Sequence, residues 1–461
     1  MYMKVKSEIF RAYDIRGVVD EELSDELVKN LGKAIGTSLL RQGRKEICVC
    51  RDGRLSGPKI IDTLINGIIS TGCNAVDMGM APTPLLYFAT FTSHVIDGVM
   101  ITGSHNPKNY NGFKIVFNQK SLTSDSIQEL KKLIISEDYE IGSGVIKYLS
   151  VTKDYIKSLR EKIKIERPVK VVLDCGNGVG GVIAPEAFKA MGIELVEIFC
   201  EVDGNFPNHH PDPGNPKNMI DLSKAVIESS ADLGIALDGD GDRLGVVDNL
   251  GNIIYPDQYL SLISEAILKE NDKRKIVFDV KCSTQLKKAI EKNGGIPVMS
   301  RTGHSYIKSE ILNSNAILGG EMSGHIFFND NWFGFDDGIF SALRLIEILT
   351  KEKNSSSDIF NRYPQLFNTP ELTIKTTDEE KFKIIERLRS DFQFDEYERI
   401  LIDGLRLENN LAWGLARASN TTPTIVLRFE GNTEESLKEI IQIFQKALFD
   451  IDKKLIIDLN L

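Results

Sequence analysis

The chain has 461 residues, 42% of them hydrophobic and 26% charged, and a formal net charge of −10 at pH 7. This length exceeds what one hydrophobic core supports and predicts three or four domains, and the acidic balance argues against a nucleic-acid-binding protein. The N-terminus lacks the apolar run of a signal peptide, and no later run is long enough to cross a bilayer, so we expect a cytoplasmic protein without a membrane partner.

The first segment leads through alternating elements to a loop rich in polar side chains. Its opening loop carries Tyr13 and Arg16. The predicted elements are helices at 25–40 and 60–69 and strands at 47–50 and 97–102. The last strand runs into Thr-Gly-Ser-His-Asn-Pro at 102–107, a common way to hold a reactive side chain, so Ser104 is a candidate nucleophile on an exposed loop. A plain turn, with the hydroxyl bonded to its own backbone, is the alternative.

The second segment ends in an acidic loop that suits a divalent cation. A predicted strand at 233–238 leads into Asp-Gly-Asp-Gly-Asp-Arg at 238–243. Three carboxylates at alternate positions, separated by glycines that let the loop curl, can converge on a hard cation. A tight hairpin is the alternative reading. An EF-hand is a poor fit, because Arg243 and Asn249 stand where glycine and glutamate are needed, and Mg²⁺ with a phosphoryl group suits the loop better.

A glycine-rich turn at 176–181 matches the dinucleotide-binding pattern Gly-x-Gly-x-x-Gly. It follows a predicted strand at 169–174, and Glu194 or Glu197 lies about twenty residues further on, as such a site requires. Nothing else in the chain supplies hydride chemistry, however. We therefore expect a structural turn and no nicotinamide site.

The third segment offers a lysine, a histidine and a second polar loop. A strand at 275–280 is followed by Lys281, which can meet a phosphate or remain a solvated lysine. His304 stands beside a glycine and is a candidate for proton transfer. A strand at 316–319 leads into a loop in which Glu321 and Ser323 can receive sugar hydroxyls, whereas a plain helix-entry loop is the alternative.

The fourth segment has a different pattern of helices and strands and predicts a smaller α+β domain. Helices are expected at 378–388 and 434–449, with a strand at 424–429. The loop before that strand carries a dense set of donors suited to a phosphate that is bound but not transferred. These donors are Arg417, Ser419, Asn420 and Thr421. Residues 351–358, rich in lysine, asparagine and serine, predict a solvated surface loop.

The first three segments look like repeats of one arrangement of elements. In each, an early strand ends at an acidic residue and a late strand is followed by a polar loop. We predict an α/β protein with three similar mixed α/β domains, mostly parallel in their sheets, and a smaller C-terminal α+β domain. The predicted domains are 1–150, 151–253, 254–366 and 367–461, with a hinge near 361–369. Ligands gather at the carboxyl ends of such strands, so the polar loops are expected to meet in one cleft.

Four of these loops resemble those of the α-D-phosphohexomutase family, most closely its bacterial phosphomannomutase/phosphoglucomutase branch. They are Thr-Gly-Ser-His-Asn-Pro at 102–107, Asp-Gly-Asp-Gly-Asp-Arg at 238–243, Gly-Glu-Met-Ser-Gly-His at 320–325 and Arg-Ala-Ser-Asn-Thr-Thr-Pro at 417–423. They occur in the family's order, one per domain, and the resemblance covers the whole chain. It implies four domains around a central cleft.

The resemblance also implies a reaction, the reversible transfer of a phosphoryl group between the 1- and 6-positions of a hexose phosphate. Ser104 would be carried as phosphoserine, and one Mg²⁺ per chain would be bound by Asp238, Asp240, Asp242 and that phosphoserine. The phosphoserine would give its group to the sugar, forming glucose 1,6-bisphosphate or mannose 1,6-bisphosphate, which turns over and returns its other phosphoryl group. Small-molecule hexose phosphates would be the partners, and no obligate protein partner is expected.

The remaining candidates follow from the need to bind the sugar phosphate in two opposite orientations, with either the 1- or the 6-position next to Ser104. Arg243 beside the metal would hold the transferred phosphate. The candidates for the distal phosphate are Tyr13, Lys281, Arg417, Ser419, Asn420 and Thr421. Glu321 and Ser323 would contact the sugar hydroxyls, and Arg16 and His304 are further substrate-binding candidates. The proton-transfer candidates are His105, Lys114 and His304.

Three alternatives remain. Phosphoglucosamine mutase is the nearest, although Met322 and Asn420 argue against it, since that branch usually shows glutamine and glycine there. A metal-dependent sugar phosphatase would use similar residues and release inorganic phosphate. A sugar-phosphate sensor would bind without turnover. The sequence leaves the choice between glucose and mannose open.

Overall fold

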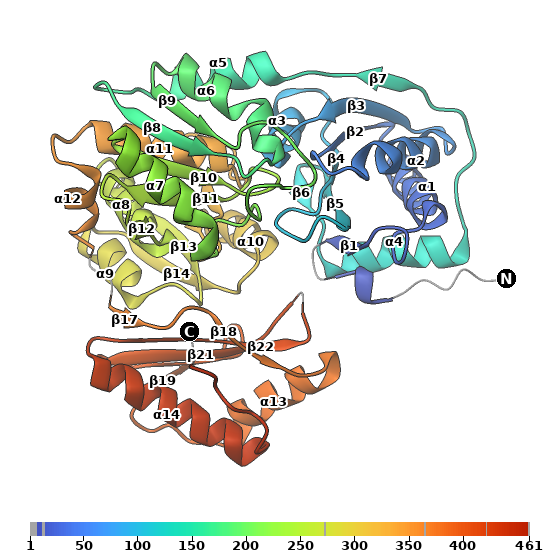
Figure 1. Ribbon diagram of the computed structural model, residues 1–461. Coiled ribbons are helices and arrows are strands. Elements are labelled where there is room, and N and C mark those ends of the chain that lie inside the picture. The colour runs from blue at the N-terminus through green and yellow to red at the C-terminus, as the bar shows by residue number, and fades with distance from the viewer. Residues whose placement is uncertain (1–6, 12–13, 272, 364–365, 421, 460–461) are drawn as a thin grey trace. The chain divides into compact units, whose positions relative to one another are not determined.

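A computed structural model describes residues 7–11, 14–271, 273–363, 366–420 and 422–459 of the chain (Figure 1). The chain divides into two compact units. Unit 1 comprises the chain up to Tyr259 together with Ser323–Phe360, and unit 2 comprises Leu260–Met322 and Asn361 onward.

The first sheet of unit 1 is mixed. Its strands are β1 (Ile15–Val18), β2 (Glu46–Arg51), β3 (Asn74–Met80), β4 (Gly98–Ile101), β5 (Tyr110–Phe117), β6 (Lys120–Ser121) and β7 (Ile146–Tyr148). They are ordered β1-β5-β4-β2-β3-β7, with β6 on β5. Strand β2 is parallel to β3 and β4, whereas β5 runs antiparallel to β4 and β1.

Helices α1 (Asp25–Arg41) and α2 (Gly57–Ile69) pack closely together beside this sheet. Ser24 caps α1 by accepting the Leu27 N–H at 3.2 Å. A Cβ at Gly32 would lie 2.3 Å from the Leu64 carbonyl oxygen, so only glycine allows the two backbones to approach this closely. The first segment also contains η1 (Ser7–Ile9), α3 (Thr83–Thr92) and α4 (Ser124–Ser136).

The second sheet of unit 1 repeats the central arrangement of the first. Its strands are β8 (Lys170–Asp174), β9 (Glu194–Ile198), β10 (Leu233–Leu237), β11 (Leu244–Asp248) and β12 (Ile253–Ile254), ordered β12-β11-β10-β8-β9. Strand β8 is parallel to β9 and β10, and β11 is antiparallel to β10. The other elements of unit 1 are α5 (Thr152–Lys162), η2 (Val179–Val182), α6 (Ala184–Ala190), η3 (Pro216–Met219), α7 (Ile220–Ser229), β16 (Ile326–Phe328), α11 (Gly338–Thr350) and α12 (Ser356–Phe360).

Unit 2 contains a parallel sheet and an antiparallel one. The parallel strands are β13 (Lys275–Asp279), β14 (Ile296–Ser300) and β15 (Leu318–Gly320), accompanied by α9 (Thr284–Lys292) and α10 (His304–Ser314). Helix α8 (Pro256–Leu268) enters unit 2 from unit 1. The antiparallel strands are β17 (Phe367–Asn368), β18 (Leu372–Lys375), β19 (Glu398–Ile400), β20 (Leu405–Glu408), β21 (Ala412–Ala418) and β22 (Thr424–Gly431). Helices α13 (Asp378–Ser390) and α14 (Glu434–Ile451) pack on one face of that sheet (Figure 1).

The predicted repeat is confirmed in the strand order. In each copy the early strand lies between the second and the late strand, and all three are parallel: β3-β2-β4, β9-β8-β10 and β14-β13-β15. The expectation of mostly parallel sheets is therefore confirmed only for these three strands of each copy. In the first two copies an antiparallel strand follows the late one, because the polar loop between them is short enough to make a hairpin.

One loop prediction was wrong in its last part. Residues 351–358 were expected to form a solvated loop; 351–355 lie outside any helix and are exposed or half-buried, but α12 begins at Ser356. The Ser356 side chain is buried and donates a hydrogen bond to the Asp232 carbonyl oxygen at 2.6 Å. A serine-rich composition therefore reflects packing here, not solvation. The domain boundaries and the hinge near 361–369 stay predictions.

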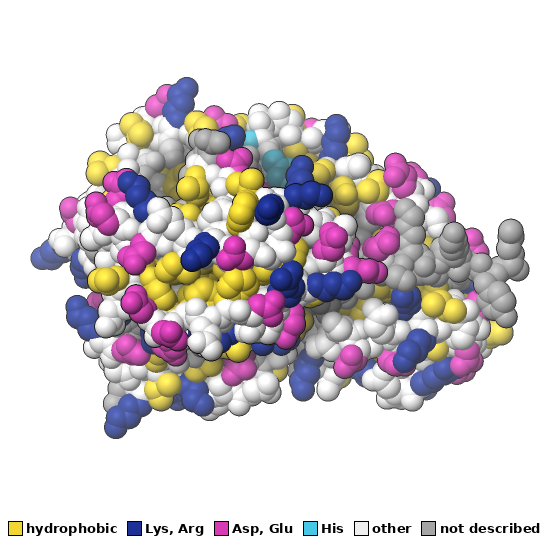
Figure 2. Space-filling view, turned by 90° about the horizontal axis from the view of Figure 1, so that it is seen from below, with side chains coloured by type: hydrophobic (Ala, Val, Ile, Leu, Met, Phe, Trp, Pro, Cys, Tyr) yellow, Lys and Arg dark blue, Asp and Glu magenta, His cyan; other side chains and the backbone are white. Residues whose placement is uncertain are grey.

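Among the residues that the structure describes, no helix is both long and apolar enough to cross a membrane. Figure 2 shows a face on which acidic and basic side chains are interspersed.

Candidate active site

The Ser104 loop is held by a buried aspartate at the end of the neighbouring strand β2. The Asp52 Oδ2 atom accepts hydrogen bonds from the Thr102 hydroxyl at 2.7 Å and the Gly103 N–H at 3.2 Å. The Ser104 N–H donates to the Thr102 hydroxyl oxygen at 2.7 Å, and Ser104 has a left-handed φ of 47°. A strained serine backbone persists only where its surroundings impose it, and such residues cluster at functional sites.

A single arginine completes this support. Arg54 is 1% exposed and lies against Gly103, where a Cβ would come within 2.4 Å of its Cζ atom. Its guanidinium donates to the carbonyl oxygens of Ser104 (2.7 Å), Asn106 (2.7 Å), Pro107 (2.7 Å) and Tyr110 (3.0 Å). Its Nε atom contacts Asp52 Oδ2 at 3.2 Å. The loop is thus organised around a buried cation that it encloses.

The acidic loop between β10 and β11 brings its first carboxylate to Ser104. The Oδ1 atom of Asp238 accepts the N–H groups of Gly241, Asp242 and Arg243 at 3.1, 3.1 and 3.2 Å, which curls the loop. Its Oδ2 atom accepts the Ser104 hydroxyl at 2.9 Å. A Cβ at Gly239 would lie 2.4 Å from the Ser104 carbonyl oxygen, so the glycine permits this approach.

The other two carboxylates of the acidic loop share a lysine. Lys114, on β5, donates to Asp240 Oδ2 at 2.6 Å and also to Asp242 Oδ2. Burial alone would lower the pKa of Lys114, but the two aspartates outweigh it and raise that pKa well above its ordinary value. Thr83 donates its hydroxyl to Asp240 Oδ2 at 2.6 Å. The Oδ1 atom of Asp240 is buried and has no hydrogen-bond partner among the described residues.

This donor set fits a hard divalent cation. One oxygen from each of Asp238, Asp240 and Asp242 can be chosen so that all lie within 4.8 Å of one another. Burial and the two neighbouring carboxylates raise the pKa of Asp238 well above its ordinary value, which shows how strongly these groups repel one another. Buried carboxylate oxygens without partners are costly, and a cation bound by all-oxygen ligands would remove that cost.

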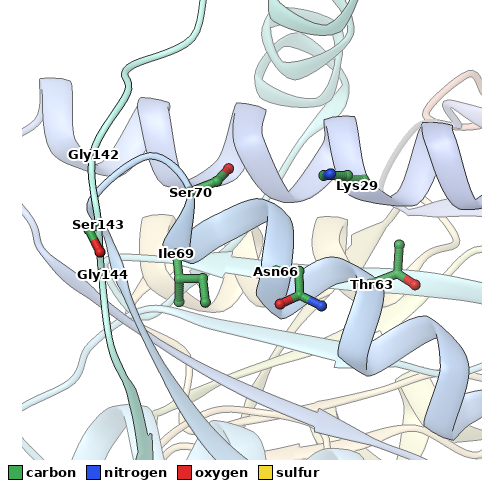
Figure 3. A pocket seen from close by; sticks show the side chains of 8 residues that line it. All are labelled: Lys29, Thr63, Asn66, Ile69, Ser70, Gly142, Ser143 and Gly144. Atoms are coloured by element: carbon green, nitrogen blue, oxygen red, sulfur yellow. The ribbon is translucent and has the colours of Figure 1, made fainter.

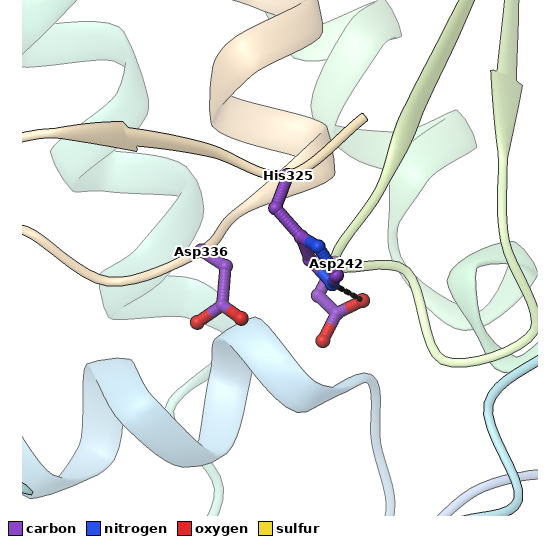
Figure 4. Close-up of side chains that lie close together, drawn as sticks. All are labelled: Asp242, His325 and Asp336. Carbon is purple, nitrogen blue, oxygen red and sulfur yellow. Dashed lines mark ion pairs between the residues drawn. The ribbon is translucent and has the colours of Figure 1, made fainter. Parts of the chain in front are cut away.

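A histidine lies on the other side of Asp242. The Nε2 atom of His325 is 3.3 Å from Asp242 Oδ1, and Asp336 completes a buried group of three (Figure 4). Arg243 donates its Nε–H to His325 Nε2 at 3.3 Å, and His325 Nδ1 lies 2.9 Å from the Ser323 hydroxyl. Burial would raise the pKa of Asp242, but Lys114 and His325 outweigh it and hold that pKa well below its ordinary value.

His105 and Arg16 approach the Ser104 loop from its outer side. The His105 Nδ1 atom lies 3.1 Å from the Ser104 hydroxyl oxygen. Burial lowers the pKa of His105 well below its ordinary value, and the cations Arg243 and Arg16 act in the same direction, so its imidazole is neutral at pH 7. Arg16 donates to the Asn106 side chain at 2.7 Å and pairs with Asp14 at 2.7 Å.

The second group of candidates lies entirely in unit 2. Asp279, at the end of β13, accepts the Thr302 hydroxyl at 3.0 Å and the Met322 N–H at 3.1 Å. It therefore joins the loop that carries His304 to the loop that carries Glu321. The two loops also meet directly, because the Gly303 N–H donates to Glu321 Oε1 at 2.6 Å.

Two buried cations complete the unit 2 group. Arg417, at the end of β21, is 4% exposed and pairs through Nε with Asp403 Oδ2 at 2.8 Å. Lys281 pairs with Glu371 at 2.9 Å. Burial alone would lower the pKa of Lys281, but Glu371 and Asp279 outweigh it and raise that pKa, so the ammonium stays charged. Arg406 and Arg428 hold the Lys281 loop by donating to the carbonyl oxygens of Val280 (2.6 Å), Cys282 (2.9 Å) and Lys281 (2.9 Å).

Comparisons with known proteins identify the family. Sequence models described as phosphoglucomutase/phosphomannomutase alpha/beta/alpha domains I, II and III and C-terminal domain match residues 7–140, 153–251, 255–367 and 371–447. The chain belongs to the phosphoglucomutase/phosphomannomutase family. A phosphomannomutase/phosphoglucomutase of Pseudomonas aeruginosa is 49% identical over 449 residues, 97% of each chain, and a Neisseria meningitidis phosphoglucomutase is 43% identical over 98% of this chain and 99% of its own. A crystal structure of a family protein from Burkholderia thailandensis has a TM-score of 0.92 at 44% identity, covering 97% of this chain and 98% of its own.

The structure places the predicted site residues of this family member in two groups. In unit 1 it brings together Ser104, His105, Lys114, Asp238, Asp240, Asp242, Arg243 and Arg16, and Ser323 contacts His325 there. In unit 2 it brings together Lys281, His304, Glu321, Arg417, Ser419 and Asn420. Tyr13 and Thr421 lie outside the described residues. The expectation of an exposed Ser104 was wrong, since the acidic loop covers it and leaves it 2% exposed.

The glycine-rich turn that matched a dinucleotide fingerprint packs against the acidic loop. The Val179 N–H donates to the Gly239 carbonyl oxygen at 3.1 Å, and a Cβ at Gly178 would lie 2.9 Å from the same atom. His209 pairs with Asp174 at 2.9 Å beside this turn. The turn and the His209 loop are thus structural supports of the acidic loop in this family member.

Sequence reasoning missed several residues that hold or extend the site. They are Asp52, Arg54, Thr83, His325, Asp336 and Asp403. His325 ends the quoted Gly-Glu-Met-Ser-Gly-His motif, so its position was visible although it received no role. Arg54 and Asp403 carried no local signal, because their partners lie elsewhere in the chain.

A separate pocket of about 550 Å³ opens between α1, α2 and the 142–144 segment (Figure 3). Lys29, Thr63, Asn66 and Ser70 contribute the polar side chains of its helical wall. None of the predicted site residues lines it.

Proposed function

We propose that this protein is a phosphohexomutase that interconverts the 1- and 6-phosphates of glucose, mannose or both. The observation that carries the proposal is the 2.9 Å contact between the Ser104 hydroxyl and Asp238, inside a buried aspartate triad. This contact supports a nucleophilic role for Ser104 beside a site for a divalent cation. Relatives that match nearly the whole chain bear the names phosphomannomutase/phosphoglucomutase and phosphoglucomutase.

The first half-reaction transfers a phosphoryl group from phosphorylated Ser104 to the free hydroxyl of a hexose monophosphate. The Ser104 oxygen–phosphorus bond breaks and that oxygen takes up a proton, while a bond from the sugar oxygen to phosphorus forms and the sugar hydroxyl gives up its proton. Arg243, whose backbone is fixed by Asp238, is placed to hold the transferred oxygens. The product is a hexose 1,6-bisphosphate.

The second half-reaction returns the other phosphoryl group to Ser104. The serine hydroxyl must lose its proton as its oxygen attacks, and we assign His105, with Nδ1 at 3.1 Å and a neutral ring, as the acceptor, because Asp238 is assigned to the cation. Lys114 and His304 remain candidates for the sugar-side proton, and the geometry adds His325, whose Nε2 faces Asp242.

Substrate recognition is divided among the unit 2 residues. We assign Arg417, Ser419, Asn420 and Lys281 to the phosphate that is not transferred, because Arg417 and Lys281 are buried cations. Glu321 and His304 would contact the sugar. Tyr13, Arg16, Ser323 and Thr421 keep the substrate-binding roles that the family resemblance implies.

The proposed cofactor is one Mg²⁺ held by Asp238, Asp240, Asp242 and a phosphoryl oxygen on Ser104. The buried Oδ1 atom of Asp240, which has no hydrogen-bond partner among the described residues, supports it. Bound there, Mg²⁺ would neutralise charge on the transferred phosphoryl oxygens. Glucose 1,6-bisphosphate or mannose 1,6-bisphosphate would activate the enzyme by phosphorylating Ser104.

Phosphorus NMR tests this function. Glucose 1-phosphate, mannose 1-phosphate and glucosamine 1-phosphate are each incubated with enzyme, Mg²⁺ and a trace of glucose 1,6-bisphosphate. We expect a 6-phosphate signal to grow without free phosphate, fastest with glucose or mannose. Release of inorganic phosphate alone would make the protein a phosphatase, and fastest turnover of glucosamine 1-phosphate would make it a phosphoglucosamine mutase.

A further inference from the structure

Asp403 bonds to two loops of unit 2 through one oxygen atom. It lies in the turn between β19 and β20, and its side chain is 16% exposed. Its Oδ2 atom accepts Arg417 Nε–H at 2.8 Å and the Thr302 N–H at 3.1 Å. Arg417 belongs to the proposed phosphate loop, and Thr302 stands two residues before His304.

The contact to Arg417 determines which of its donors remain available. A guanidinium is planar, so a carboxylate bound at Nε fixes the directions of both terminal nitrogens. The Nη2 atom of Arg417 is buried and has no hydrogen-bond partner in the described part of the chain. Burying a cationic donor without a hydrogen-bond partner costs free energy. This indicates that a bound anion accepts a hydrogen bond from Nη2.

The same aspartate sets the position of the His304 loop relative to Arg417. The Thr302 peptide is held on both sides, since Asp403 accepts its N–H and the Asn420 side chain donates to its carbonyl oxygen at 3.3 Å. Arg301 Nε also donates to the Ile402 carbonyl oxygen at 3.0 Å. Asp403 therefore lies at the centre of a junction between the loop at 301–304 and the phosphate loop.

We propose that Asp403 is a positioning residue for substrate binding. It aims the terminal nitrogens of Arg417 at the phosphate that is not transferred and keeps His304 at a fixed distance from that phosphate. The inference rests on the proposed function, because it takes Arg417 as the phosphate ligand. It goes beyond that function in assigning the orientation of Arg417 to one carboxylate.

A double-mutant cycle in the full-length enzyme tests the proposal. The variants are Asp403→Ala, Arg417→Ala and their combination, and kcat and KM are measured with glucose 1-phosphate. We expect Asp403→Ala to raise KM about tenfold or more with a smaller change in kcat, and to raise it less than about twofold further in the Arg417→Ala background. Asp391→Ala is the matched control, because Asp391 accepts Arg387 Nε–H at 3.0 Å in the same side-on manner on an exposed helix end.

A merely structural Asp403 would give a different pattern. Its loss would lower the amount of folded enzyme and leave KM unchanged, or its effect would add fully to that of Arg417→Ala, and either result would overturn the proposal. If Asp403→Ala does not fold, Asp403→Asn serves instead, since it keeps an acceptor and removes the charge. We then expect a smaller rise in KM, and an unchanged KM would again overturn the inference.

Binding measurements separate this inference from the proposed function. Calorimetric titration of glucose 6-phosphate into Ser104→Ala enzyme, with and without Asp403→Ala, requires no turnover. Weaker binding by at least about fivefold in the double variant supports the positioning role even if the wild-type enzyme proves to be a phosphatase. Equal binding would overturn the positioning role even if the wild-type enzyme is an active mutase.

Discussion

Asp337 makes the stability of unit 1 depend on pH near neutrality. Its side chain caps α11 by accepting the Phe340 N–H at 2.9 Å, and it accepts the Tyr155 hydroxyl at 2.9 Å and Trp332 Nε1–H at 3.2 Å. It is 1% exposed. Burial raises the pKa of Asp337 to about 7, although these three hydrogen bonds oppose the shift.

The direction of the effect follows from the raised pKa. The carboxyl ionises near pH 4 in the unfolded chain but only near pH 7 in the folded chain, so the folded state binds the proton more tightly. Its stabilising contribution is complete below pH 4 and is lost as the pH rises through 7. At about 1.4 kcal/mol per pH unit, the loss between pH 5 and pH 8 is about 3 kcal/mol.

The substitution Asp337→Asn isolates this contribution, because asparagine keeps an acceptor for Tyr155 and the Phe340 N–H but cannot ionise. Melting temperatures of both proteins are measured from pH 5 to pH 8. We expect the melting temperature of the variant, relative to wild type, to rise by several degrees across this range. Asp62→Asn, at an exposed position on α2, is the control and should give a constant difference. A constant difference for Asp337→Asn as well would refute the reasoning.

Three further predictions concern the unit 1 site. Ser104→Ala should abolish mutase turnover while glucose 6-phosphate still binds, and near wild-type turnover would remove Ser104 from the mechanism. Arg54→Met should lower the free energy of unfolding by about 3–5 kcal/mol, measured by urea denaturation, because Asp52 and four carbonyl oxygens lose a buried partner; a loss below about 1 kcal/mol would contradict its assigned role. Mg²⁺ at a hundred times its dissociation constant should stabilise metal-free enzyme by about 2.7 kcal/mol in thermal-shift titrations; an equal response in Asp240→Asn would place the ion elsewhere.

Much of the fold was visible in local patterns. The expected helix at 25–40 is α1, and the expected strands at 47–50 and 275–280 are β2 and β13. These predictions are correct because a helix or strand that is buried on one face repeats its apolar residues every 3.6 or 2 positions, and that repeat is visible in the sequence. The helix at the end of the predicted loop 351–358 was missed because its serines satisfy buried partners, and polarity alone does not show that.

The residue types of the candidate site were predictable from the sequence, but the residues that hold its loops in place were not. The acidic loop and Ser104 follow late strands, so their chemistry was visible in the motifs at 238–243 and 102–107. That Ser104 is buried was not, because its cover comes from a loop more than a hundred residues away. Arg54 reaches the Ser104 loop across fifty positions, a distance over which sequence spacing carries no information.

The sequence by itself determined the three-copy α/β plan, the polar loop after each late strand and the residue types for phosphoryl transfer. These depend on periodicity and on local turns, which neighbouring residues decide. Only the tertiary structure decided which side chains meet: Ser104 with Asp238, Lys114 with two aspartates, and Asp403 with Arg417. Such contacts depend on how separate elements pack, and packing brings together groups whose sequence separation says nothing about their distance.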